Sequence, residues 1–94
     1  MNPSLDPGEK ELLQERLLVL CNAGGHFGVP EERLLFVARQ FGFDTLSAAQ
    51  LTTELIHLEK LGLISTLQKT LRPDRRRWST TAAGDRHLME HGLL

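Results

Sequence analysis

Cationic side chains gather in one short stretch of this 94-residue chain. Five of the eleven Lys/Arg side chains fall within nine positions: Lys69, Arg72, Arg75, Arg76 and Arg77. By contrast, residues 1–68 hold five Lys/Arg against nine Asp/Glu. A guanidinium can donate two parallel hydrogen bonds to a phosphate, and it suits a narrow groove of negative potential. The stretch therefore predicts a local contact with an anionic partner, although a solvated basic turn has the same composition.

A second group of candidate residues falls within a strong helix signature at residues 47–61. Ser47 can cap this helix, and Gln50, three residues later, completes a capping box. Leucines recur at helical spacing and predict the buried face: Leu51, Leu55 and Leu58. The opposite face then projects into solvent, where its side chains could contact the base edges and phosphates of duplex DNA.

The residue types on that outer face allow specific contacts. Gln50 could pair with adenine, Ala49 could contact a thymine methyl group, and Lys60 could bind a backbone phosphate. We expect DNA contacts from Ser47, Ala49, Gln50, Thr53, His57 and Lys60 on the helix, and from Arg72, Arg75, Arg76 and Arg77 beyond it. Glu54 and Glu59 place negative charge on the helix and Ile56 points outward, so a solvated face or a protein contact remains an alternative.

Other signals along the chain complete the set of expected elements. Asp6 and Pro7 begin a helix, and Gly24 and Gly25 end it. A β-branched stretch after Gly62, followed by turn residues, predicts a hairpin. We expect helices at 7–23, 30–41, 47–61 and 81–92, with a wing at 63–80. This order predicts a mainly helical α+β fold over residues 1–94, a single winged helix-turn-helix domain with a three-helix core, a two-stranded β-wing and a short C-terminal helix.

Three motifs in this region resemble those of known regulators. Residues 58–64 read Leu-Glu-Lys-Leu-Gly-Leu-Ile, residues 73–76 read Pro-Asp-Arg-Arg, and residues 78–84 read Trp-Ser-Thr-Thr-Ala-Ala-Gly. Over roughly residues 30–88 the chain resembles the DNA-binding domain of MarR-, PadR- and ArsR-type bacterial regulators. The resemblance implies that 47–61 is a recognition helix and that Asp74 holds the guanidinium of Arg76. The wing is shorter than in typical MarR proteins, and the sequence ends before that family's long dimerisation helices.

Two further patterns could suggest metal chemistry. His87-Leu88-Met89-Glu90-His91 matches H-x-x-E-H, which places both histidines on one helical face. Asp85-Arg86-His87 resembles the first half of the ArsR metal-sensing motif, but the chain ends before the second half. Cys21 is the single cysteine and has no second thiol to complete a site. We therefore expect no catalytic residues, no metal site and no cofactor, and we do not expect an enzyme.

Composition sets the remaining expectations. The chain is 40% hydrophobic and 24% charged, as in globular proteins, and it has no apolar run of the length that spans a bilayer. We expect a cytoplasmic protein with duplex DNA as partner and no membrane contact. Surplus apolar residues suggest a homodimer through the N- and C-terminal helices: Leu18, Val19, Leu88, Met89, Leu93 and Leu94.

The aromatic side chains are predicted to fill the core. Trp78 lies at a strand position that suits packing between hairpin and helices, and the same role is expected of Phe27, Phe36, Phe41 and Phe43. The sequence favours a transcriptional regulator that binds specific DNA sequences. The alternative is a winged helix that serves as a protein-interaction module, inside a larger complex or a mobile-element protein.

Overall fold

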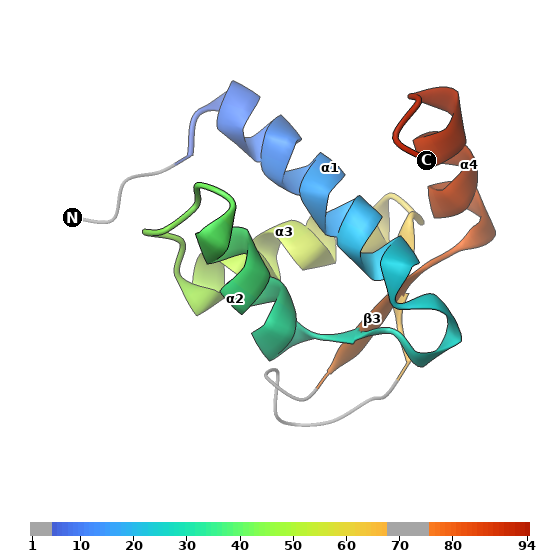
Figure 1. Cartoon of the computed structure of the whole chain (residues 1–94), viewed down its shortest axis with the longest axis horizontal. Coiled ribbons are helices and arrows are strands. Elements are labelled where there is room, and N and C mark those ends of the chain that lie inside the picture. Colours follow the sequence, from blue (N-terminus) through green and yellow to red (C-terminus); the bar gives the residue numbers. More distant parts are fainter. Residues whose placement is uncertain (1–4, 68–75) are drawn as a thin grey trace.

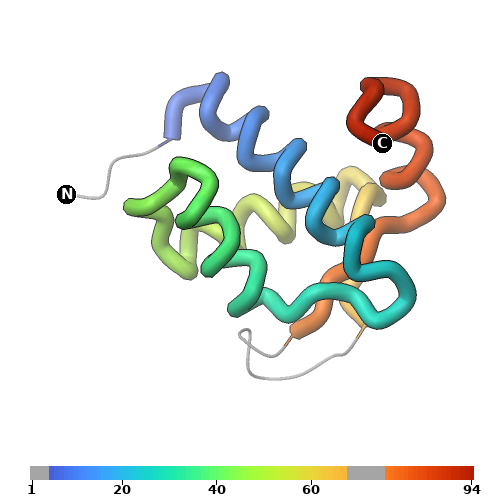
Figure 2. Tube along the Cα trace, viewed as in Figure 1, coloured from blue at the N-terminus to red at the C-terminus, as the bar shows by residue number. Residues whose placement is uncertain are grey.

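Residues 5–67 and 76–94 are described by the computed structural model, in which helices predominate (Figure 1). Its elements are α1 (Pro7–Ala23), the 3-10 turn η1 (Gly25–Phe27), β1 (Val29–Pro30), α2 (Glu31–Gln40), α3 (Ala48–Lys60), β2 (Ile64–Thr66), β3 (Arg77–Thr80) and α4 (Ala82–Glu90). The tube in Figure 2 shows α1 and α2 side by side and antiparallel, with α3 behind them. The architecture is the mainly helical α+β winged helix expected from the sequence. Within the two described ranges no helix is long and apolar enough to cross a membrane.

Three of the helices begin at side-chain caps. The Asp6 carboxylate accepts a hydrogen bond from the Glu9 backbone N–H at 2.7 Å, and this bond lowers the pKa of Asp6. Ser47 caps α3 through a complete capping box with Gln50, as predicted. Thr81 caps α4 by accepting from the Gly84 backbone N–H at 3.1 Å. Each cap satisfies a backbone amide that the helix leaves unpaired, and so stabilises the first turn of its helix.

The sheet has three antiparallel strands in the order β1–β3–β2. Thr66 of β2 pairs with Trp78 of β3, so the chain folds back as the predicted hairpin requires. Val29 of β1 pairs with the same tryptophan from the other side. The connection between the first two expected helices therefore contains a 3-10 turn and ends in a strand. The expected two-stranded wing is part of a larger sheet. A strand of two residues is too short to show alternation in the sequence.

The core lies between the three long helices and the sheet. It consists of Leu13, Leu17, Leu18, Cys21, Leu34, Ala38, Phe43, Leu46, Leu51, Leu55, Leu58, Ile64, Trp78 and Leu88. Trp78 is buried as predicted, with 1% of its surface exposed. The same prediction for the four phenylalanines is wrong for three of them, because Phe27, Phe36 and Phe41 are 83%, 62% and 57% exposed. Whether a phenylalanine is buried depends on which face of its helix or turn it occupies, and the residue type alone does not reveal that face.

Cys21 is part of this core and has no exposed surface. Burial disfavours the thiolate and raises the pKa of the thiol to about 12. The side chain is therefore protonated at neutral pH, and it packs as a small apolar group.

The start of α4 packs tightly against the end of the hairpin. The Asp85 carboxylate accepts hydrogen bonds from Thr80 Oγ1 at 2.6 Å and from Asn22 Nδ2 at 2.7 Å, so it connects β3, α1 and α4. These bonds favour the ionised form and lower the pKa of Asp85, Thr80 having the larger effect. Gly84 lies directly against the backbone of Leu63, where a Cβ atom would overlap the carbonyl oxygen.

Replacing Gly84 with alanine is expected to destabilise the fold by about 2 kcal/mol, because backbone atoms at Leu63 cannot move aside as a flexible side chain would. Gly8→Ala is the matched control. Gly8 lies in the exposed first turn of α1, and alanine there is expected to stabilise slightly through its helix propensity. Urea unfolding followed by tryptophan fluorescence measures both changes. Equal stability of the two variants would contradict the close packing of α4.

Candidate nucleic-acid interface

The first residue of α2 is a buried carboxylate. Glu31 is 5% exposed, and its two oxygens accept from different elements. Oε1 accepts from the indole Nε1 of Trp78 at 2.8 Å, and Oε2 accepts from the Thr52 hydroxyl at 2.6 Å. The Glu31 backbone N–H donates to the carbonyl of Arg76 at 2.8 Å. One residue therefore connects α2 to α3 and to the strand β3.

Arg76 is the third partner of this carboxylate. Its Nη2 lies 3.2 Å from Oε1 of Glu31, and its guanidinium carbon lies 5.5 Å from the centre of the Trp78 ring. The Arg76 side chain retains 21% exposure. An arginine expected at the DNA therefore has an ion-pair partner within the protein. The implied partner Asp74 lies outside the described residues, and so do Arg72 and Arg75.

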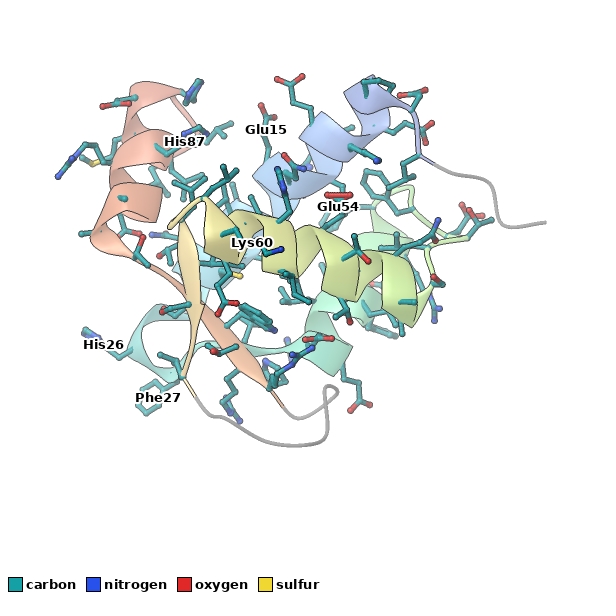
Figure 3. All side chains as sticks on the ribbon, turned by 180° about the vertical axis from the view of Figure 1, so that it is seen from behind. Glu15, His26, Phe27, Glu54, Lys60 and His87 are labelled. Carbon is teal, nitrogen blue, oxygen red and sulfur yellow. The ribbon has the colours of Figure 1, made fainter. Side chains whose placement is uncertain are left out.

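The α3 helix turns a continuous stripe of side chains toward solvent. Ala49, Thr53, His57 and Lys60 are all exposed, at intervals of three or four residues that place them on one face. The opposite face is fixed by Leu51, Leu55 and Leu58, each no more than 1% exposed. The Thr53 hydroxyl donates its hydrogen to the Ala49 carbonyl at 3.0 Å. Toward an outside partner, its oxygen can therefore act as a hydrogen-bond acceptor. Figure 3 shows α3 from this side, with Lys60 near its C-terminal end.

Ser47 and Gln50 hold the beginning of α3 in place. The Ser47 hydroxyl accepts from the Gln50 backbone N–H at 3.1 Å, and Gln50 Oε1 accepts from the Ser47 backbone N–H at 2.9 Å. Both residues are half-buried. Their side chains complete the capping box, so the first role of these two predicted contact residues is to position the helix.

The charge of the outer face differs from the expectation in one respect. Glu54 is 7% exposed, points toward α1 and accepts from Gln14 Nε2 at 3.0 Å (Figure 3). Glu54, whose charge on the helix was expected to weaken attraction to DNA, is therefore turned away from the outer face. Glu59 is exposed and accepts from the Thr66 hydroxyl at 3.4 Å. Ile56 is half-buried, so it does not project fully outward.

Arg77 lies on the other face of the sheet from its neighbour Trp78, since side chains alternate along a strand. It is exposed, and its Nη1 donates to the carbonyl of Phe27 at 3.3 Å. Arg76 and Arg77, adjacent in sequence, therefore differ in environment: one is held against the core and the other lies on the outer surface of the sheet.

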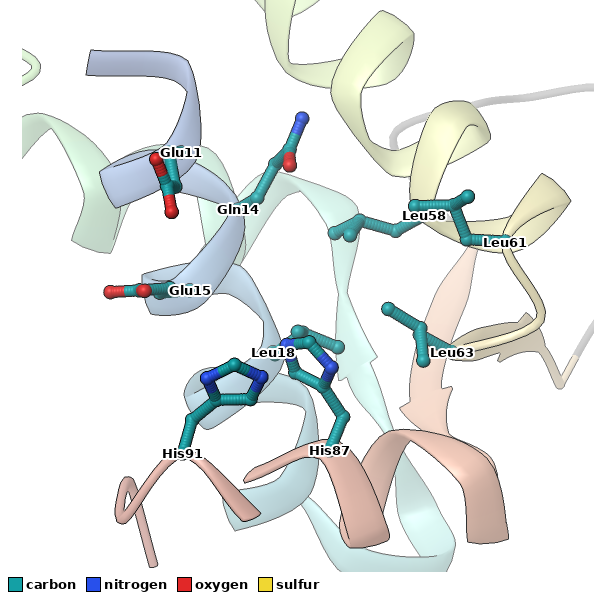
Figure 4. Close-up of a pocket in the computed structure, with 9 residues that line it drawn as sticks. All are labelled: Glu11, Gln14, Glu15, Leu18, Leu58, Leu61, Leu63, His87 and His91. Atoms are coloured by element: carbon teal, nitrogen blue, oxygen red, sulfur yellow. The ribbon is translucent and has the colours of Figure 1, made fainter. Parts of the chain in front are cut away.

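The two histidines of the H-x-x-E-H pattern lie together beside α1. The rings of His87 and His91 are 4.2 Å apart between centroids, and both line a hollow of about 190 Å³ opposite Glu11 and Glu15 (Figure 4). Gln14, Leu18 and three other leucines form the rest of its lining. In residues 5–67 and 76–94, no three His, Cys, Asp or Glu side chains are grouped so as to hold a metal ion.

Comparison with known proteins agrees with this winged-helix geometry. No family model and no curated protein matches the sequence. Among solved structures, the crystal structure of a PadR-like transcriptional regulator from Bacillus cereus matches with a TM-score of 0.72 and 23% sequence identity, over 89% of this chain and 81% of that chain. The chain therefore shares the fold of a PadR-like regulator, one of the three types that its sequence resembles.

Glu31→Gln is expected to destabilise the protein by about 2 kcal/mol, because it removes the charge that compensates Arg76 while leaving that guanidinium against the core. Glu32→Gln is the matched control. Glu32 is the exposed next residue of the same helix, and its change is expected to stay within about 0.5 kcal/mol. Urea titration monitored by tryptophan emission measures both. If the two variants unfold at the same urea concentration, the role given to Glu31 is wrong.

Proposed function

We propose that this chain binds duplex DNA as a transcriptional regulator, with α3 in the major groove. The observation that supports this most is the exposed stripe of α3, from Ala49 to Lys60, on a helix whose other face is fixed in the core. A rigid helix with an unoccupied outer face is what the major groove accommodates. The shared fold with a PadR-like transcriptional regulator supports the same proposal.

Each side chain of the stripe has a role in this proposal. The Ala49 methyl group contacts a thymine methyl, and the Thr53 hydroxyl accepts from a base amino group or approaches a phosphate. His57 projects toward the same groove, and Lys60 neutralises a backbone phosphate. Ser47 and Gln50 approach the DNA at the helix N-terminus, where their capping bonds fix the angle of entry.

The arginines after β2 add contacts to the DNA backbone or minor groove. We assign these contacts to Arg72, Arg75 and Arg77. Arg76 acts differently in the proposal: its ion pair with Glu31 anchors the end of the basic stretch to α2 and to the core tryptophan. The start of β3 is thereby held at a fixed position relative to α2.

A homodimer through α1 and α4 would present two such helices to a palindromic site. Met89 and Leu94, exposed by 64% and 61%, support this second part of the proposal. Leu18 and Leu88, which were also expected to contribute, are buried in the core of the chain itself. The proposed dimer contact therefore rests on the apolar residues that the core leaves exposed, Met89 and Leu94.

Replacing Lys60 with alanine is expected to weaken DNA binding at all sequences. It is also expected to reduce the magnitude of the slope of log affinity against log salt by about 0.9, which corresponds to one lost phosphate contact. Fluorescence anisotropy with a random-sequence duplex at several salt concentrations measures this slope. Arg86→Ala is the matched control, because Arg86 is also an exposed cation, on α4, and is not one of the proposed DNA-contacting residues.

Two results would contradict the proposal. The first is an unaltered chain that binds no duplex at low salt. The second is an Arg86→Ala variant that loses as much affinity as Lys60→Ala, since binding would then depend on net charge and not on α3.

The second candidate function is a protein-interaction module. The exposure of Phe36 on α2 and of Phe41 at its C-cap favours it, because DNA binding alone gives no reason for two large aromatic side chains in solvent there. The two functions use different faces and are compatible.

A further inference from the structure

Two of the exposed phenylalanines belong to a single apolar surface on α1 and α2. We define this aromatic–arginine face by Arg16 and Leu20 of α1 and by Arg33, Phe36, Val37 and Phe41 of α2 and its C-cap. Phe36 and Phe41 are 62% and 57% exposed, and Arg16 and Arg33 are exposed as well. Aromatic and arginine side chains are the types that dominate binding energy at protein interfaces.

The face contains two neighbouring hollows. One hollow, of about 470 Å³, runs along α2 and is lined by Arg33, Phe36 and Val37 among others. A second, of about 280 Å³, lies between α1 and α2 and includes Leu20 and again Arg33 and Val37. Because two residues line both hollows, the hollows adjoin and form one corrugated surface.

The far end of the face is held together by a contact between the two helices. The Arg16 guanidinium carbon lies 5.3 Å from the centre of the Phe41 ring. This cation–π contact orders Phe41 while leaving most of its surface exposed. An aromatic ring that is already ordered loses little entropy when a partner covers it.

The position of this face leaves it accessible during DNA binding. In Figures 1 and 2, α1 and α2 lie in front of α3. Figure 3, turned by 180°, shows α3 in front instead, with the proposed DNA-contacting residue Lys60 labelled on it. The aromatic–arginine face belongs to α1 and α2 and the outer stripe belongs to α3, so the two surfaces share no residue.

We propose that the aromatic–arginine face docks an acidic amphipathic helix of a partner protein. The charge of the face supports this occupant. Arg33 lines both hollows and Glu32 lines one of them, and Arg16, beside Phe41, adds a second cation outside the hollows. This local cationic excess occurs within a segment, residues 1–68, that is acidic as a whole. A two-fold copy of the chain would instead place this face against itself and bring like charges together.

The dimensions of α2 define the segment that fits. Ten helical residues span about 15 Å, which corresponds to about three turns of a partner helix lying alongside. Such a helix would place apolar anchors at i, i+4 and i+7 into the two hollows, with Asp or Glu between them facing Arg16 and Arg33. The partner class is thus an amphipathic helix whose polar positions are acidic.

The test uses the full chain and two fluorescein-labelled helical peptides of about 15 residues, long enough to cover α2. Both peptides carry leucines at i, i+4, i+7 and i+11, and their polar positions are all Glu in one and all Lys in the other. We expect anisotropy titration to show about tenfold tighter binding of the Glu peptide. Phe36→Ala is expected to weaken that binding about tenfold, and Arg33→Glu to reverse the preference between the peptides.

Phe27→Ala is the matched control. Phe27 is 83% exposed but lies on η1, outside the aromatic–arginine face, so its removal is expected to leave the binding unchanged. Equal binding of the two peptides, no binding of the Glu peptide, or an equal loss in Phe27→Ala would overturn the proposal. Self-association of the chain that Phe36→Ala abolishes would overturn it too, in favour of a second copy. The titration contains no DNA, so its outcome is independent of the proposed DNA binding.

Discussion

A single buried carboxylate, Glu31, determines how the helices and the sheet of this domain fit together. It accepts hydrogen bonds from Thr52 on α3 and Trp78 on β3, and it pairs with Arg76 where β3 begins. Removing a carboxylate from water is costly unless its oxygens are bonded in the interior, and here both oxygens are bonded. The same bonds require α2, α3 and β3 to keep one relative position. The angle between the helix and the sheet is therefore set by polar bonds of fixed direction, in addition to apolar packing.

The consequence for function is a fixed relation between the two proposed DNA-contacting elements. On one side of Glu31, α3 is held by its buried leucines and by the bond from Thr52. On the other side, the ion pair of Arg76 holds the end of the basic stretch. A DNA-binding surface made of a helix and a wing is effective when both reach the duplex without rearrangement, because ordering on binding reduces affinity. The aromatic–arginine face belongs to α1 and α2, so the proposed DNA surface and the proposed docking surface share no residue.

The sequence predicts best those features that depend on local spacing. The capping box at Ser47, the buried face of α3 and the burial of Trp78 follow from residue type and period, and the structure confirms them. The sequence could not predict β1, whose two residues form a strand only because β3 lies beside them. Nor could it separate Glu31 from Glu32. Both look like acidic residues that favour a helix N-terminus. Only Glu31 is buried, and it is buried because it accepts the hydrogen bond of the Trp78 indole, a contact that lies far away in the sequence.

The hydrogen bond from the Trp78 indole to Glu31 can be measured directly, because the chain has one tryptophan and so gives a single indole N–H signal in ¹⁵N NMR. The exchange of this proton with deuterium reports whether the bond is closed in the native state. If Glu31 holds helix and sheet together, the proton exchanges at least about a thousandfold more slowly than in free indole, because it opens only with the core. Exchange within about tenfold of free indole would contradict the account, since the buried carboxylate would then not bind the strand.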